Sequence, residues 1–246
     1  MAELQRAWLW IAVCALLACS PADAPESSEA ARRDIVGTET KRYSQFDEEL
    51  VIRDFFQDRE GGFFLDVGSA QPDTMSTTYY LEKHLGWSGI AVDALARYAP
   101  AYEELRPRTA FFSYIVTDHA GTRDKFYVVP GAPGLSSTQE GRVFRGEKLF
   151  QQEIEVPTIT LDLLLERNGV EKIDFLSMDI EHGAPKALAG FDIEKYRPEL
   201  VCIEHSWDYD REYNDALLAW FEKHGYEKLE RYESYDSVNW YFAPRR

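Results

Sequence analysis

Residues 62–68 read Gly-Phe-Phe-Leu-Asp-Val-Gly, and this stretch decides the fold. A short run of Phe, Leu and Val that ends at an acidic residue and a glycine is typical of a buried strand followed by a tight turn. Residues 89–93, Gly-Ile-Ala-Val-Asp, repeat the pattern after a segment over 76–85 that has helical spacing. Two buried strands joined by a helix predict a parallel β-α-β unit.

The same alternation of apolar runs and amphipathic segments continues to the C-terminus. Further strands are expected at 110–116, 125–129, 173–178 and 200–204, further helices at 98–105, 160–167 and 214–224, a long loop at 130–146, and a closing hairpin formed by 226–231 and 238–243. This order predicts an α/β fold with a doubly wound, mostly parallel sheet and a C-terminal antiparallel hairpin.

The N-terminal segment indicates export. Residues 7–19 carry no charge, but a membrane-spanning helix needs roughly 20 apolar residues, so the run has the length of a signal-peptide core instead. Leu16-Leu17-Ala18-Cys19 resembles the lipobox of bacterial lipoproteins, which implies a signal peptide over 1–19, lipidation of Cys19 and a place in the bacterial cell envelope. A wrongly assigned start or a plain buried helix is the alternative, and it would leave the protein in the cytoplasm.

Residues 20–42 are expected to form a disordered tether, because the part up to residue 33 is rich in Ser, Ala, Pro and Glu and lacks aromatic residues. No similar linker recurs, so residues 43–246 are expected to form one domain. The chain has 43 acidic and 27 basic residues and a formal charge of −16, which disfavours a nucleic-acid-binding surface. Its three cysteines exclude a disulfide framework, and the oligomeric state stays open.

Acidic side chains gather where the expected strands end. Ligands of such sheets bind beyond the carboxyl ends of the strands. The candidates are Asp66 with Gly68, Asp93, the run Asp179, Glu181 and His182, and the pair Glu204 and His205. Gly68 permits close approach of a ligand, and Asp93 offers the two acceptor oxygens that a ribose requires. There is no G-x-G-x-x-G, P-loop or G-x-S-x-G motif, which argues against a dinucleotide, a nucleotide phosphate or a serine hydrolase.

Several of these segments resemble the FkbM family of S-adenosylmethionine-dependent methyltransferases. The similar segments are 64–69 (FLDVGS), 76–82 (STTYYLE), 85–93 (LGWSGIAVD), 156–162 (VPTITLD), 173–181 (IDFLSMDIE), 188–192 (LAGFD), 197–198 (RP) and 203–205 (IEH). They occur in the family's order over roughly residues 50 to 243, which is more specific than any single motif.

The resemblance implies a Rossmann-like class I methyltransferase fold with S-adenosylmethionine as cofactor. The implied cofactor contacts are Asp66, Gly68, Ser69 and Asp93, with Asp118 near the adenine, and the implied catalytic residues are Asp179, Glu181 and His182. The family's usual reaction is O-methylation of sugars or secondary metabolites, so a small-molecule or glycan acceptor is expected. The sequence departs from the family at residues 182–185, His-Gly-Ala-Pro, and at Asp93, where a Glu is usual.

Three alternatives stay open at this point. The protein is a non-catalytic envelope module if the exported chain never meets a cofactor that is made in the cytoplasm. His182 is either a general base or a solvent-exposed loop residue. Asp179, Glu181 and Glu204 have the chemistry to bind a divalent cation, but such carboxylates more often bond to the backbone, so no metal is expected. The aromatic residues Trp207, Tyr209 and Tyr213 are expected to pack in the core rather than to stack on a sugar.

Overall fold

The computed structural model describes residues 32–144, 146–206 and 210–246. The expected signal peptide, its lipidation site Cys19, the tether up to residue 31, and Trp207 and Tyr209 lie outside these residues. The folded unit covers Arg33–Arg246. Within the described part of the chain, none of the helices combines the length and the apolar character that a membrane crossing requires.

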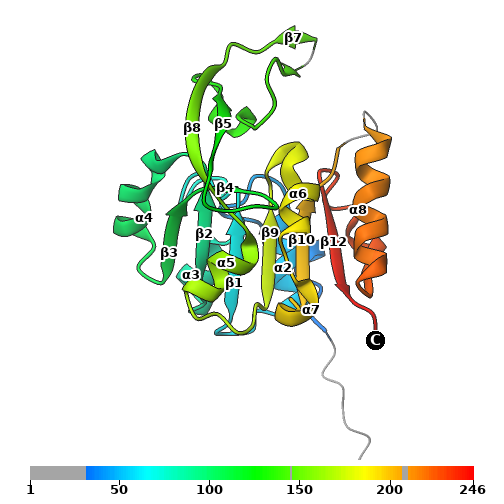
Figure 1. Cartoon of the computed structure of the whole chain (residues 1–246). Helices are drawn as coiled ribbons and strands as arrows, with labels where there is room; N and C mark the ends of the chain where they lie inside the picture. The colour runs from blue at the N-terminus through cyan, green and yellow to red at the C-terminus, as the bar shows by residue number, and fades with distance from the viewer. Residues whose placement is uncertain (1–31, 145, 207–209) are drawn as a thin grey trace, which may run out of the picture. The chain divides into compact units, whose positions relative to one another are not determined.

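A seven-stranded sheet with the order β11-β12-β10-β9-β1-β2-β3 forms the centre of the fold (Figure 1). Its strands are β1 (Phe63–Val67), β2 (Ser88–Asp93), β3 (Thr109–Ser113), β9 (Phe175–Met178), β10 (Leu200–Glu204), β11 (Tyr226–Lys228) and β12 (Asn239–Pro244). The strands from β10 to β3 in this order pair in parallel, and β12 is antiparallel to both β10 and β11. The predicted α/β class, the mostly parallel sheet and the C-terminal hairpin are confirmed.

Helices cover both faces of this sheet, and the alternation of side chains along β1 shows why. Leu65 and Val67 join a core cluster with residues of α5 (Leu161–Arg167), α6 (Ala184–Ala189), α7 (Ile193–Tyr196) and α8 (Arg211–Lys223). Phe64 points to the opposite face, where it packs with α2 (Glu48–Phe56) and α3 (Tyr79–Leu85). In Figure 1, α5 and α7 lie in front of the sheet and α2 and α3 behind it. A sheet that is buried on both faces explains the continuous apolar runs.

Local capping sets helix boundaries that apolar spacing alone misplaces. The helix expected at 214–224 begins at Arg211, because the Asp210 carboxylate caps it and accepts the Tyr213 amide at 3.0 Å. The remaining short helices are α4 (Ala99–Leu105), which lies against β3, and the 3-10 turns η1 (Ala96–Tyr98), η3 (Glu181–Gly183) and η4 (Glu230–Tyr232).

A second, three-stranded sheet with the order β4-β8-β5 stands beside the carboxyl ends of the main sheet. It consists of β4 (Ile115–Val116), β5 (Arg123–Val128) and β8 (Gln152–Ile159), and the segment between β5 and β8 holds η2 (Pro133–Leu135), β6 (Val143–Phe144) and β7 (Glu147–Lys148). The single strand expected at 110–116 is therefore wrong, because the chain leaves the main sheet after Ser113 and β4 pairs with β8. The first four residues of β8 are exposed, so the strand has no apolar run to reveal it.

Residues 33–42 belong to the folded unit, which corrects the last part of the expected tether. A short helix, α1 (Ile35–Thr38), packs on α2. The Ile35 side chain is buried, and its amide donates to Asp54 Oδ1 at 3.2 Å. A single buried residue in a polar stretch produces no apolar periodicity, so the sequence does not predict this helix. The domain therefore begins near residue 33 rather than at residue 43.

Candidate active site

Four strands of the main sheet end in register at their carboxyl ends. The residues that follow the last shared positions are neighbours across the sheet, and we call them the strand-end row: Asp93, Gly68, Asp179 and Glu204. The alternation of strand side chains directs the three acidic members toward the same face of the sheet. The row therefore brings together carboxyl groups that lie up to 111 positions apart in the sequence.

Gly68 occupies the one position of the row that cannot carry a side chain. Its φ is +82°, and a Cβ atom there would lie 1.8 Å from the carbonyl oxygen of Asp179. Its amide donates to the Val92 carbonyl at 2.8 Å, which holds the turn against β2. Only glycine fits this conformation and this contact. The row therefore has no side chain between Asp93 and Asp179.

Asp93 and Ser69 have the features of ligand-binding groups. The Asp93 oxygens accept the Leu95 amide at 2.8 Å and the Ala70 amide at 3.1 Å, which fix the carboxylate while each oxygen retains a free lone pair. Burial raises the pKa of Asp93. The Ser69 hydroxyl is buried and has no hydrogen-bond partner within the described residues. A buried hydroxyl that lacks a partner fits a site that a polar ligand completes.

Asp66 has a structural role beside the row. Its buried carboxylate accepts the Thr78 hydroxyl at 2.6 Å, which ties the segment after Gly68 to β1. Burial raises the pKa of Asp66 from 3.8 to about 6, although the Thr78 hydrogen bond and the Arg106 charge oppose the rise. The resemblance implies that Asp66 contacts the cofactor. In the structure its carboxylate instead bonds to the Thr78 hydroxyl.

Arg106, which the sequence analysis did not single out, organises the segment from residue 69 to residue 78. Its fully buried guanidinium bonds to Glu82 Oε2 at 2.7 Å, to the Pro72 carbonyl at 2.8 Å and to the Thr78 hydroxyl at 3.1 Å. A buried charge with this many partners fixes the backbone that carries Ser69. The arginine follows a short helix about thirty positions away, so no local pattern marks it.

Asp179 and Glu204 form a pair of adjacent carboxyl groups. Burial and then the nearby Glu181 raise the pKa of Asp179 to about 6, while a hydrogen bond from Glu204 opposes the rise. Burial and then the Asp179 charge raise the pKa of Glu204 to about 10. Asp179 is nevertheless solvent-exposed. Asp179 therefore combines a shifted pKa with access for a ligand.

Glu181 lies close to Asp179 and Glu204, and its negative charge is paired with an arginine. Its φ is +56°, a left-handed conformation that costs a non-glycine residue roughly 1 kcal/mol. Arg142, from the segment between β5 and β8, forms an ion pair with its carboxylate, and both side chains are largely buried. The Tyr213 hydroxyl donates to the Glu181 carbonyl at 3.0 Å. These contacts hold the strained turn and connect the second sheet to the site.

Two predicted site residues, His182 and Asp118, lie outside the strand-end row. The His182 Nε2 atom lies 3.6 Å from Asp210 Oδ2, and its buried Nδ1 atom meets no partner in the part of the chain that is described. Its ring packs against that of Tyr213 with centroids 5.0 Å apart. Asp118 is exposed, follows β4 rather than a strand of the row, and bonds to the neighbouring His119 Nδ1 at 2.8 Å.

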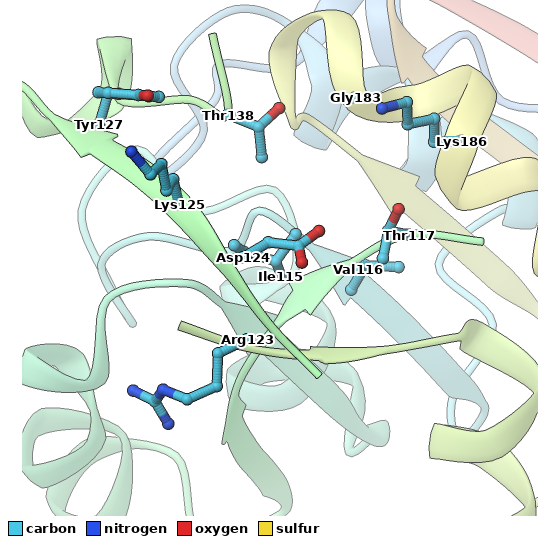
Figure 2. Close-up of a pocket in the computed structure, with 10 residues that line it drawn as sticks. All are labelled: Ile115, Val116, Thr117, Arg123, Asp124, Lys125, Tyr127, Thr138, Gly183 and Lys186. Carbon is cyan, nitrogen blue, oxygen red and sulfur yellow. The ribbon is translucent and has the colours of Figure 1, made fainter. Parts of the chain in front are cut away.

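Two cavities border the second sheet. A cavity of about 450 Å³ lies between the second sheet and η3 with α6, and Figure 2 shows the Asp124 side chain directed toward Thr117 while Arg123 points away. A cavity of about 320 Å³ begins directly after Asp93 and has a largely aliphatic wall that includes Leu95. Within residues 32–144, 146–206 and 210–246, no three His, Cys, Asp or Glu side chains are grouped so that they could hold a metal ion.

Comparison with known protein families gives one match. Residues 66–228 match the family model of the methyltransferase FkbM domain. No curated protein matches the chain.

Three solved structures illustrate the similarity. A TehB-like SAM-dependent methyltransferase from Corynebacterium glutamicum is 14% identical with a TM-score of 0.45, over 82% of this chain and 89% of that one. A SAM-dependent methyltransferase from Geobacter sulfurreducens is 13% identical with a TM-score of 0.41, over 82% and 76%. A precorrin-6y C5,15-methyltransferase from Geobacter metallireducens is 9% identical with a TM-score of 0.42, over 80% and 87%.

Replacement of Gly68 by alanine tests the close approach to Asp179. We expect Gly68→Ala to lower the free energy of unfolding by more than about 4 kcal/mol or to prevent folding, because the added Cβ meets backbone. Gly86→Ala is the control, because Gly86 has φ +67° and open space around it; its cost should be about 1 kcal/mol. Urea unfolding measures both, and equal costs would contradict the contact.

Substitution of Asp66 tests its burial. Because the folded state raises its pKa from 3.8 to about 6, this carboxyl binds a proton more tightly when folded, so its contribution to stability is lost as the pH rises through 6. In Asp66→Asn the drop in unfolding free energy between pH 4 and pH 7 should be smaller than in the wild type by about 2 kcal/mol. Glu60→Gln, which removes an exposed carboxylate, should leave the drop unchanged. The same drop in all three proteins would refute the assignment.

Proposed function

This chain belongs to the methyltransferase FkbM domain family, and we propose that it transfers a methyl group from S-adenosylmethionine to a hydroxyl group of a small molecule or glycan. One observation supports the proposal: the strand-end row places Gly68, which has no side chain, between the fixed Asp93 carboxylate and the Asp179 carboxylate. When bound, S-adenosylmethionine supplies an electrophilic methyl group on a cationic sulfonium. The acidic row complements that positive charge.

The residues near Asp93 fit the nucleoside part of this cofactor. The fixed Asp93 carboxylate has one free lone pair on each oxygen to accept the two ribose hydroxyls. The Ser69 hydroxyl offers the polar end of the ligand an unused donor. The cavity of about 320 Å³ that follows Asp93 has aliphatic walls, including Leu95 and Val156, and these suit a flat purine. The exposed Asp118 is then not required for binding.

Asp179 is the group we assign as general base. A pKa of about 6 leaves it ionised near neutral pH and close to the value at which proton transfer is most efficient. Its carboxylate would accept the proton of the acceptor hydroxyl, while the surrounding residues hold the reacting groups in line. Glu181 forms an ion pair with Arg142, which stabilises the turn that follows Asp179. His182, with its unpartnered Nδ1 atom, is the second candidate for the base.

The larger cavity supports a hydroxyl-rich acceptor. It adjoins the turn that carries Glu181, and its lining supplies hydroxyl groups from Thr117 and Thr138 and charges from Asp124 and Lys186. A lining that holds both hydrogen-bond donors and hydrogen-bond acceptors suits the hydroxyl groups of a sugar better than it suits an apolar metabolite. Figure 2 shows these side chains arranged around the cavity.

A transfer assay with tritiated S-adenosylmethionine and a panel of monosaccharides and disaccharides tests the proposal. Asp93→Asn should raise the KM for S-adenosylmethionine by roughly ten- to hundredfold, because hydrogen bonds to a charged acceptor weaken. Asp179→Asn should lower kcat by about a hundredfold or more with little change in that KM, because it removes the base.

Asp118→Asn serves as the control and should match the wild type in both constants. If Asp118→Asn were as damaging as Asp93→Asn, the assignment of the ribose site would be wrong. A folded protein that neither binds nor turns over S-adenosylmethionine would instead support the non-catalytic envelope module. The family match disfavours that alternative, and so do a fixed Asp93 and an unpartnered Ser69, which a module without ligand would not need.

The N-terminal sequence supports a position in the bacterial cell envelope, with a lipid anchor on Cys19. We expect radioactive palmitate to label the wild-type protein and the Cys14→Ala control, but not Cys19→Ala, because Cys19 ends the lipobox-like segment. An unlabelled wild-type protein would contradict the anchor and would favour a cytoplasmic enzyme, which has direct access to S-adenosylmethionine.

A further inference from the structure

Asp179 and Glu204 are neighbours because of the sheet itself. Met178 and Ile203 are paired in the parallel register of β9 and β10, so the next residue of each strand lies beside that of the other. Side chains at equivalent positions of adjacent parallel strands point to the same face. The Tyr213 hydroxyl donates to the Glu204 carbonyl at 3.3 Å, which ties this strand end to α8. The backbone pairing of β9 and β10 thus fixes the two carboxyl-bearing residues side by side.

The surroundings of the pair oppose a second negative charge. Among the described residues, the charged or titratable groups that interact with it are Asp66 on β1, Asp93 on β2, Glu181 on η3, Arg142 between β5 and β8, Cys202 on β10 and Tyr213 on α8. The one cation among them, Arg142, already pairs with Glu181. In such an acidic site the negative charge of one carboxylate opposes ionisation of the carboxyl group beside it. This favours a pair in which one carboxyl group keeps its proton.

Several observations indicate which carboxyl keeps the proton. Asp179 has solvent-exposed surface, whereas Glu204 is only partly exposed. Burial raises the pKa of Glu204 to about 10 and that of Asp179 to about 6. A negative charge is better solvated on the more exposed Asp179, so the proton of the pair lies on Glu204 and Asp179 is ionised.

We propose that Glu204 is a positioning residue, whose protonated carboxyl donates a hydrogen bond to Asp179 and keeps that carboxylate ionised and oriented toward the acceptor hydroxyl. The part that concerns the acceptor rests on the proposed function. During the reaction the proton of the acceptor hydroxyl would move to a carboxylate oxygen of Asp179, and an electron pair of the acceptor oxygen would form the new bond to the methyl carbon. The bond from that carbon to the sulfonium sulfur would break, and its electron pair would stay on the sulfur of the S-adenosylhomocysteine that leaves. Glu204 keeps its own proton throughout, and Asp179 later returns the transferred proton to water.

Carbon-13 NMR of the full chain, labelled at the Asp and Glu carboxyl carbons, tests this arrangement without any acceptor. We expect the Glu204 signal, assigned by its loss in Glu204→Gln, to titrate far above the usual range of a glutamate, near pH 10. In Asp179→Asn the Glu204 midpoint should fall, because the neighbouring charge is removed.

Two substitutions separate positioning from simple filling of space. Glu204→Gln keeps a neutral hydrogen-bond donor, so the Asp179 midpoint should stay near 6. Glu204→Ala removes the donor, so the Asp179 midpoint should rise by about 1 to 2 pH units. Circular dichroism checks that each variant is folded, and the wild-type titration decides the question if one is not.

A Glu204 signal that titrates near pH 4 to 5 would overturn the proposal, as would equal Asp179 midpoints in Glu204→Gln and Glu204→Ala. The outcome is separable from that of the transfer assay. A pair that titrates as expected in a protein without methyl transfer would refute the proposed function and leave the shared proton intact. Methyl transfer by a protein with an ordinary Glu204 titration would refute the shared proton and leave the proposed function intact.

Discussion

The contact between Gly68 and the carbonyl oxygen of Asp179 is the constraint on which the site depends. No Cβ fits at Gly68 because the Asp179 carbonyl oxygen occupies that space, so the chain segments after β1 and β9 are in close contact. Asp93 and Asp179 end or follow the two strands that flank β1. Because Gly68 has no side chain, none projects between these two residues.

The contacts that surround this glycine turn are maintained at a cost in stability. Arg106 fixes the segment that carries Ser69, and the ion pair between Arg142 and Glu181 fixes the turn after Asp179. Burial raises the pKa of Asp66, Asp93 and Asp179, so each of these carboxylates is less stable in the folded protein than in water. Sites that concentrate like charges in this way favour function over maximal stability.

The sequence predicts the central sheet because buried parallel strands leave continuous apolar runs, and it predicts Gly68 and Asp93 because each ends such a run. It does not predict β8, whose exposed half has no apolar run, or the partners Arg106 and Arg142, which reach the site from elsewhere in the chain. Those contacts exist only after the chain has folded. The same reason hides the pairing of Asp179 with Glu204, since a register between strands is a property of the sheet.

The strand-end row is the proposed binding site of S-adenosylmethionine. A crystal structure of the protein with S-adenosylhomocysteine tests it most directly. We expect the ribose hydroxyls on the Asp93 carboxylate, the sulfur atom over Gly68, and the open side of the sulfur facing Asp179. A ligand bound away from Gly68, or one whose ribose contacts Asp118 in place of Asp93, would contradict the account.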